Sequence, residues 1–416
     1  MSPVNPGPVT PQPPVLTDPE VADLVAQESR RRATTLQLIA SETPASPAVR
    51  AALATELGTK YAEGYPGARY HGGCEVVDEI ERLAIARTAA TFGADYVNVQ
   101  PLSGSIANLA VYAAFAQQGD PILALRLDQG GHQTHGSRAN FSGRWFLPIH
   151  YGVRETTERI DYDALRELAL VHRPRILVAG STSYSRHIDI AALRSIADDA
   201  EAVLWVDAAH TAGLAAAGVA PSPVPHADVV TLATHKVLRG PRGGIILARA
   251  DHHDVLQKAV HPFIQGGPSM NSIAAKAVCM REAGTPEFAD YATTMVAAAA
   301  RLAAELAERG LRIVTGGTDI HLAVVDVSGL GLTGVQASER LAAAGIVVDK
   351  AVLPFDTQPP AQGSAVRVGT SAAVLAGLGV DDMPAVAECI VAALRAAPDG
   401  DQHAGIRGQI AEMLAG

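Results

Sequence analysis

Short apolar segments alternate with helical ones from residue 96 to about residue 250 of this 416-residue chain. A strongly helical pattern over residues 75–93 leads into the first of them. The strand-like segments are residues 96–99, 122–125, 176–179, 202–207, 227–232 and 243–248. Short aliphatic and β-branched runs are typical of buried strands, and their alternation with helices favours a mostly parallel sheet. The sequence therefore predicts an α/β fold, in which ligands bind at the carboxyl ends of the strands.

Two charged residues stand where predicted strands end. Asp207 closes the segment 202–207, and Lys236 follows the segment 227–232 within a glycine-rich run, residues 234–244. A lysine amine can form a Schiff base with the aldehyde of pyridoxal 5′-phosphate (PLP), and a carboxylate can keep the pyridine nitrogen of PLP protonated. The pair favours a PLP site over the alternative, an ordinary solvated loop lysine.

A candidate anion site follows the strand over residues 96–99. Ser103, Gly104 and Ser105 stand directly before a helix-like segment, residues 107–115. Backbone N–H groups at a helix N-terminus bind anions, so we expect the PLP phosphate here. A Ser-Gly-Ser sequence without this context is usually a polar turn.

Motifs along most of the chain resemble those of serine hydroxymethyltransferases. They are residues 38–42 (LIASE), 60–67 (KYAEGYPG), 69–73 (RYHGG), 103–108 (SGSIAN), 130–136 (GGHQTHG), 207–210 (DAAH), 234–244, 265–268 (QGGP) and 367–370 (RVGT). The similarity runs from about residue 20 to about residue 395 without a large gap. It implies a fold-type I PLP-dependent transferase, with a mostly parallel seven-stranded sheet between helices in a large domain and a smaller C-terminal α/β domain.

We expect four parts along the chain. The proline-rich residues 1–15 are predicted to be a disordered extension. Residues 16–60 would form an N-terminal helical arm, residues 61–285 the large PLP-binding domain, and residues 286–416 the small domain.

The resemblance assigns roles around the cofactor. Lys236 would hold PLP, Asp207 would contact its ring nitrogen, and His132 and Ala209 would pack on the two faces of the ring. The other expected cofactor contacts are Ser103, Gly104, Ser105, His210, His235 and Gly267, the last reaching the site of a neighbouring subunit. The resemblance also makes His132 a catalytic candidate, and the alternative for it is a loop histidine that caps a turn.

The resemblance also indicates which residues contact the amino-acid substrate. A guanidinium binds a carboxylate through two parallel hydrogen bonds, so Arg367 is the candidate clamp for the α-carboxylate, with Ser41 as a second contact. Glu63 and Tyr61 would carry the proton transfers of retro-aldol cleavage of a β-hydroxy amino acid. The remaining expected substrate contacts are Tyr70 and His71, the latter also a catalytic candidate.

Several residues depart from the family pattern. His71 replaces a tyrosine, and a histidine titrates near neutral pH where a phenol does not. Gln133 stands in place of a leucine, and Ala351 in place of an asparagine that binds the pterin. A lost polar contact to a buried ligand costs roughly 1–3 kcal/mol, so the use of tetrahydrofolate is left open. Other differences are Leu102, Ile106, Ala233, Ser269 and Asn271.

Three functions are compatible with these residues. The first is a serine hydroxymethyltransferase proper, which interconverts serine and glycine with tetrahydrofolate as one-carbon acceptor. The second is a relative with an altered acceptor or donor: an α-methylserine hydroxymethyltransferase, a folate-independent aldolase or an L-threonine transaldolase of a biosynthetic pathway. The third is a catalytically silent PLP-binding protein, which the complete set of PLP residues disfavours. We favour the first.

Composition limits the partners of this chain. Its net charge is −10 and it has no basic block, which argues against nucleic-acid binding. No apolar run approaches the roughly 20 residues needed to cross a bilayer, and no signal-peptide pattern opens the chain. Three widely spaced cysteines indicate a reducing compartment, so we expect a cytoplasmic enzyme without a metal site. The resemblance implies a homodimer with active sites at its interface, and pairing of dimers into tetramers is left open.

Overall fold

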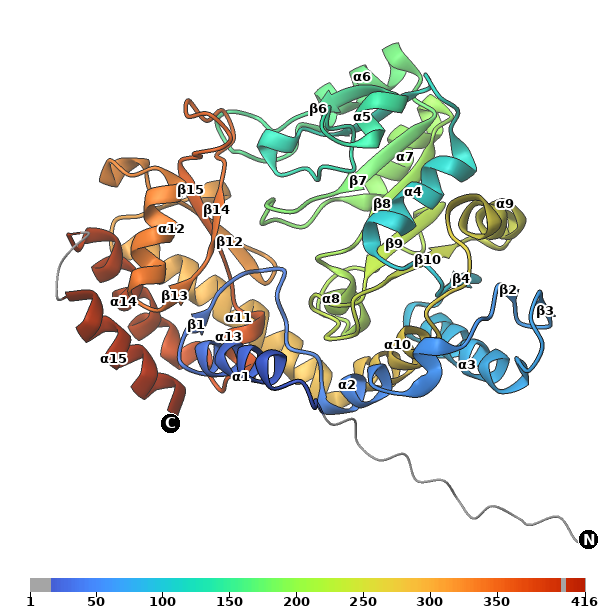
Figure 1. The fold of residues 1–416 in the computed structure, drawn as a ribbon. Helices are drawn as coiled ribbons and strands as arrows, with labels where there is room; N and C mark the ends of the chain where they lie inside the picture. The colour runs from blue at the N-terminus through green and yellow to red at the C-terminus, as the bar shows by residue number, and fades with distance from the viewer. Residues whose placement is uncertain (1–15, 398–401, 416) are drawn as a thin grey trace, which may run out of the picture.

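The computed structural model describes residues 16–397 and 402–415, whose fold is shown in Figure 1. The predicted disordered extension, residues 1–15, lies outside the described residues. Among the helices that the structure describes, none is long and apolar enough to cross a membrane.

The larger of the two main sheets has seven strands, in the order β4-β10-β9-β8-β7-β5-β6. The strands are β4 (Tyr96–Asn98), β5 (Pro121–Leu125), β6 (Leu147–Tyr151), β7 (Ile176–Gly180), β8 (Val203–Asp207), β9 (Val229–Ala233) and β10 (Gly244–Ala248). Only β10 runs antiparallel to its neighbours. The predicted mostly parallel seven-stranded sheet is confirmed. The sequence reading missed β6, an edge strand that contains Pro148, a residue which edge strands tolerate.

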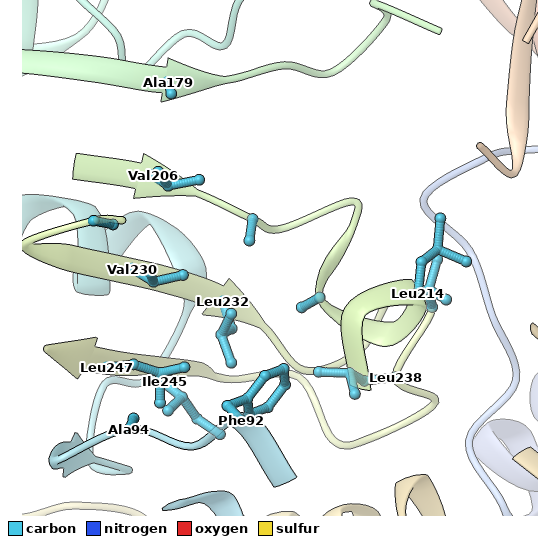
Figure 2. Close-up of a cluster of buried hydrophobic side chains, with 14 of the residues drawn as sticks. Phe92, Ala94, Ala179, Val206, Leu214, Val230, Leu232, Leu238, Ile245 and Leu247 are labelled. Atoms are coloured by element: carbon cyan, nitrogen blue, oxygen red, sulfur yellow. The ribbon is translucent and has the colours of Figure 1, made fainter. Parts of the chain in front are cut away.

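Helices cover both faces of this sheet (Figure 1). In β8, Leu204 and Val206 belong to one hydrophobic cluster and Trp205 to another, because successive side chains in a strand point to opposite faces. Part of the first cluster is shown in Figure 2, where Val206, Val230 and Leu247 come from neighbouring strands. Every residue of β7, β9 and β10 is buried, which leaves the strand ends for ligands. The helices are α3 (Glu75–Phe92), α4 (Gly104–Phe115), α5 (Phe141–Trp145), α6 (Tyr162–His172), α7 (Ile190–Ala200), α8 (Ala212–Ala216), α9 (His253–Lys258) and α10 (Met270–Ala283).

The second main sheet is antiparallel and has a hydrophobic core of its own. Its order is β11 (Arg312–Ile313), β12 (Leu322–Asp326), β15 (Ala365–Gly369) and β14 (Asp349–Ala351). The helices that follow α10 are α11 (Pro286–Glu308), α12 (Gly334–Ala343), α13 (Ser371–Leu375), α14 (Met383–Arg395) and α15 (Gln402–Ala415). The segment from Met270 to Glu308 forms two helices, α10 and α11, because Thr285 caps α11 by accepting the N–H of Phe288. The smaller α/β unit that the resemblance implied is present.

The N-terminal segment joins the two cores. It contains α1 (Pro19–Ala33), β1 (Leu36–Gln37) and α2 (Pro47–Leu53), followed by the hairpin of β2 (Gly64–Tyr65) and β3 (Ala68–Arg69). β1 pairs in parallel with β13 (Ile346–Val347), beside the smaller sheet. Helix α1 buries none of its residues, and Leu24 is 63% exposed. A single chain therefore leaves the apolar residues of α1 uncovered.

Candidate active site

Lys236 lies on a tight loop that directly follows β9. The N–H of Thr234 donates to the carbonyl of Gly243 (3.1 Å), and its Oγ1 donates to the carbonyl of Pro241 (2.5 Å). These two bonds fold the loop back on itself and fix the position of Lys236. Burial lowers the pKa of Lys236 to about 8, although the charge of Asp207 opposes this. A lower pKa leaves more of the side chain as the neutral amine, which is the nucleophilic form.

Asp207 ends the neighbouring strand β8 and is held by three donors. Its Oδ2 accepts from Asn108 Nδ2 (2.8 Å) and from His135 Nε2 (3.0 Å), and its Oδ1 accepts the N–H of Ala209 (3.0 Å). Burial opposes ionisation, but the hydrogen bond and charge of His135 hold the pKa of Asp207 well below its usual range. The carboxylate is therefore charged at neutral pH and fixed in direction.

His132 is oriented by Thr134, two residues along the chain. Its Nδ1 accepts the N–H of Thr134 (3.2 Å) and lies 2.7 Å from the Oγ1 of the same residue. Because Nδ1 accepts, the proton of the neutral ring is on Nε2. Burial lowers the pKa of His132 to about 4, so the ring is uncharged at pH 7. An uncharged flat ring in a fixed orientation suits stacking on an aromatic ligand.

The two other histidines predicted to contact the cofactor, His210 and His235, are also held neutral. Burial lowers the pKa of His210 far below its usual value, and its ring stacks on that of His321 with centroids 5.5 Å apart. Burial lowers the pKa of His235 to about 4. Within the part of the chain that the structure describes, the Nδ1 of His235 is buried and has no hydrogen-bond partner.

The predicted phosphate site lies at the N-terminus of α4. Ser103 caps this helix, since its Oγ accepts the N–H of Ile106 (3.2 Å). A Cβ atom on Gly104 would lie 3.4 Å from the Cβ of Ala233, and one on Gly244 would lie 2.3 Å from the carbonyl oxygen of Ser103. The start of α4 therefore packs directly on the ends of β9 and β10, next to the loop of Lys236.

Arg367 lies in the middle of β15 and approaches the same region from the smaller sheet. Its Nε and Nη2 donate to Oδ2 of Asp349 (3.2 and 2.5 Å), and its Nη1 donates to the carbonyl of Thr182 (2.6 Å). Its positive charge helps to lower the pKa of Lys236. Ser41 directly follows Ala40, whose Cα lies 2.5 Å from where a Cβ on Gly369 would be. The segment around Ala40 is thus packed against the end of β15.

The remaining predicted residues form a separate group. The rings of Tyr61 and His71 lie 5.3 Å apart, and a Cβ on Gly267 would lie 3.4 Å from Cγ of Glu63 and 3.7 Å from Tyr61. Tyr61 is 65% exposed and Tyr70 is 74% exposed. No hydrogen bond or ring contact within the described ranges joins this group to Lys236. Among the described residues, a single chain therefore brings the acid–base candidates together without a direct contact to Lys236.

A cavity of about 740 Å³ opens beside Arg367 and His132. Gln133 and Ala351, two of the departures from the family pattern, line it, and so does Asp349. Two of the residues that distinguish this chain thus line the same cavity as the candidate carboxylate clamp.

Comparison with known proteins decides the family. The family model for serine hydroxymethyltransferase matches residues 15–390. The chain belongs to the serine hydroxymethyltransferase family. It is 51% identical over 371 residues to a serine hydroxymethyltransferase of Coprothermobacter proteolyticus, covering 89% of each chain. It is 49% identical over 396 residues to one of Koribacter versatilis, covering 95% of this chain and 93% of the relative.

The serine hydroxymethyltransferase family uses PLP and tetrahydrofolate, and the residues around Lys236 fit PLP. The nucleophilic amine of Lys236 matches the aldehyde of PLP. The fixed carboxylate of Asp207 matches the ring nitrogen of PLP, and the capped N-terminus of α4 matches its phosphate. Among the described residues, His132, His135 and Asp207 also offer possible metal ligands within 4.8 Å of one another. His135 and Asp207 already bond to each other, and the fit to PLP accounts for this group without an ion.

Sequence reasoning missed three residues of this serine hydroxymethyltransferase site. Asn108 and His135 donate to Asp207, and Asp349 accepts from Arg367. The signal for Asn108 was its place one helical turn beyond Ser105 and Gly104, on the same face of α4. The signal for His135 was the second histidine of the 130–136 motif. Asp349 had no signal in the sequence, since its role depends on the register of β14 with β15.

Proposed function

We propose that this chain transfers the hydroxymethyl group of serine to tetrahydrofolate and so interconverts serine and glycine. The observation that carries the proposal is the meeting of three groups: Lys236 follows β9, Asp207 ends the neighbouring strand β8, and the charges of Asp207 and Arg367 both act on the buried amine of Lys236. When bound, PLP draws electrons from the bonds to the substrate Cα and so weakens the Cα–Cβ bond. Identity near 50% to two serine hydroxymethyltransferases supports the same reaction.

The residues of the chain have separate tasks in this reaction. Lys236 holds the cofactor through its amine, and the charged Asp207 keeps the ring nitrogen of the cofactor protonated. Neutral His132 would pack on one face of the ring, with Ala209 on the other. Arg367 and Ser41 bind the substrate carboxylate, which orients the bond to be broken. Glu63, assisted by Tyr61 and His71, takes the proton of the substrate β-hydroxyl and returns it in the reverse direction.

We also propose that two chains share their active sites in a homodimer. The support is the separation of the group around Glu63 and Tyr61 from Lys236, together with the exposure of Tyr61, Tyr70 and Leu24 in a single chain. In a symmetric dimer, the Glu63 group of each chain can complete the site of the other. Gly267, which packs beside that group, then reaches the phosphate of the neighbouring site. Pairing of dimers into tetramers and a cytoplasmic location remain predictions.

A side-by-side assay tests the reaction. Purified enzyme with PLP is given L-serine, α-methyl-L-serine or L-threonine, each with and without tetrahydrofolate, and glycine or D-alanine is quantified. We expect glycine from serine at a rate that rises steeply with tetrahydrofolate, and none from Lys236→Ala. Equal serine cleavage with and without tetrahydrofolate would contradict the proposed acceptor.

The second candidate is a relative with an altered acceptor or donor. The observation that favours it is the position of Ala351 and Gln133 on the wall of the cavity beside Arg367. In the same assay, an α-methylserine hydroxymethyltransferase prefers α-methyl-L-serine, a folate-independent aldolase needs no tetrahydrofolate, and a threonine transaldolase prefers L-threonine with a second aldehyde.

A further inference from the structure

Lys276 is a lysine that the proposed reaction does not use. It lies on α10 and is 1% exposed, which is rare for a lysine side chain. Its Nζ donates to three backbone carbonyls, those of Val99 (2.6 Å), Pro101 (3.0 Å) and Gly244 (2.9 Å). No carboxylate forms a salt bridge with it among the described residues. A buried cation is therefore coordinated by the main chain alone.

The three carbonyl acceptors indicate whether the amine of Lys276 is protonated. An ammonium group has three N–H donors and a neutral amine has two, so only the ammonium can serve all three carbonyls. Burial lowers the pKa of Lys276 to about 7, and the charge of Glu81 opposes this. Loss of the proton would leave a buried carbonyl without its donor, which is unfavourable. The three-carbonyl arrangement thus favours the charged form.

The three carbonyls lie on two segments beside the start of α4. Val99 and Pro101 connect the end of β4 to Ser103, and Gly244 begins β10. The N–H of Gly244 also donates to the carbonyl of Pro101 (3.0 Å). Lys276 and Gly244 therefore share one acceptor, and together they fix the chain two residues before the helix cap.

This arrangement orients backbone groups at the candidate anion site. A trans peptide bond directs its C=O and N–H to opposite sides, so a Pro101 carbonyl that faces Lys276 turns the N–H of Leu102 away from it. Gly244 lies against Ser103 so closely that a Cβ there would be 2.3 Å from the Ser103 carbonyl oxygen. The ammonium of Lys276 thus lies behind the segment 101–105, and its positive charge favours an anion in front of it.

We propose that Lys276 is a positioning residue for the cofactor phosphate: it holds the segment 101–105 in the shape that binds the phosphate and adds a buried positive charge behind it. This inference rests on the proposed function, because it takes PLP as the ligand. A purely structural role predicts a general loss of stability. A positioning role predicts a loss specific to ligands that carry the phosphate.

The test compares two ligands that differ only by the phosphate. Full-length protein stripped of cofactor is titrated with PLP and with pyridoxal, and binding is followed by visible absorbance. For Lys276→Met, which keeps the length of the chain but removes its charge, we expect PLP affinity to fall about tenfold or more and pyridoxal affinity to change less than about threefold. Lys276→Gln, which keeps polar donors, should lie between Lys276→Met and the wild type.

Cys279→Ala is the matched control, because Cys279 is buried on the same helix but donates to the carbonyl of Leu238 and not to the segment 101–105. It should leave the ratio of the two affinities unchanged. An equal loss of affinity for both ligands, or no loss for either, in Lys276→Met and Lys276→Gln overturns the inference. If the wild-type protein does not bind PLP, the proposed function fails instead. Should Lys276→Met not fold, the ratio in Lys276→Gln decides.

Discussion

Asp349 and Arg367 stand directly opposite each other on β14 and β15, and two nitrogens of the guanidinium donate to one carboxylate oxygen. A third nitrogen of Arg367, Nη1, donates to the carbonyl of Thr182. The candidate clamp for the substrate carboxylate is thus already fixed by the protein, with the Nε edge of Arg367 occupied. A substrate carboxylate must bind the remaining donors on Nη1 and Nη2, close to the negative charge of Asp349.

This proximity predicts that Asp349→Asn binds serine more tightly. The substitution removes a negative charge near the substrate carboxylate but keeps an oxygen that can accept from Arg367. Two charges about 6 Å apart near a protein surface repel by about 1 kcal/mol or more, so the KM for serine should fall about fivefold with little change in kcat. Steady-state kinetics measure both. Asp128→Asn, in the same cavity but paired with Arg126, is the control and should change neither. An unchanged or higher KM in Asp349→Asn contradicts the repulsion.

The sequence predicted those parts of the candidate site that depend on local sequence patterns. Lys236 and Asp207 follow strands, and in a mostly parallel sheet strand ends meet at one edge, so their proximity followed from the fold class. Ser103 to Ser105 begin a helix, which is also a local property.

The residues that sequence reasoning missed depend on contacts between distant segments. Asn108 reaches Asp207 across 99 residues and His135 reaches it across 72, and no periodicity encodes such pairs. The edge strand β6 was missed because proline and histidine interrupt its apolar pattern. The sequence also could not show that Glu63 makes no direct contact with Lys236 in a single chain. Under the proposed dimer, the two residues meet only between subunits, and no local sequence pattern encodes such a contact.

The lowered pKa of Lys236 predicts how the cofactor-free enzyme takes up PLP. Below a pKa of about 8 most of the amine is protonated and cannot attack an aldehyde, so the rate of bond formation should rise about tenfold per pH unit up to pH 8 and level off above it. Stopped-flow absorbance after mixing with PLP measures this rate. Pyridoxine 5′-phosphate, which has no aldehyde, should bind without this dependence. A flat profile for PLP between about pH 6 and 9 would show that burial does not tune the amine.

We expect Ala351→Asn to raise the affinity for tetrahydrofolate. An amide at this position of the cavity wall would restore a hydrogen-bond partner for a buried ligand, worth roughly 1–3 kcal/mol. Ala351→Asn should therefore lower the KM for tetrahydrofolate by about tenfold and leave the KM for serine unchanged. Cleavage of L-threonine without folate serves as the internal control and should not respond. If the folate KM does not fall, Ala351 does not face the pterin.

The shared-site dimer predicts recovery of activity from two inactive variants. In Lys236→Ala mixed with Glu63→Gln, half of the reassociated dimers are mixed and each has one intact site, so activity should reach about a quarter of the wild-type value. Activity is measured after the subunits are separated in mild denaturant and recombined. Lys236→Ala mixed with Arg367→Ala is the matched control, because both defects then fall on the Lys236 side of a site and no mixed dimer has an intact one. Equal recovery in both mixtures, or none in the first, contradicts the shared site.

We expect replacement of Arg69 to cause a large loss of stability, because its buried guanidinium neutralises two carboxylates. It donates to Asp78 (2.8 Å) and Glu81 (2.6 Å), and all three side chains are at most 10% exposed. It also donates to the carbonyls of Ala62 and Gly64, on either side of Glu63. Replacement by methionine leaves Glu81 without its ion pair and Asp78 with only the more distant Arg82 (3.7 Å), which costs about 3–5 kcal/mol of unfolding free energy. Urea denaturation at pH 8 measures this loss.

The pH dependence separates this cause from a packing defect. Burial already raises the pKa of Glu81, and removal of Arg69 raises it further above the unfolded value. A carboxyl group with a raised folded pKa destabilises the protein as pH rises and is relieved as pH falls, so Arg69→Met should regain part of its stability between pH 8 and about pH 5.5. Arg82→Met, which removes the half-exposed partner of Glu79 and a more distant partner of Asp78 (3.7 Å) but leaves Arg69 in place, should cost less than about 1 kcal/mol at either pH. A loss in Arg69→Met that is the same at both pH values would point to lost packing rather than unpaired charge.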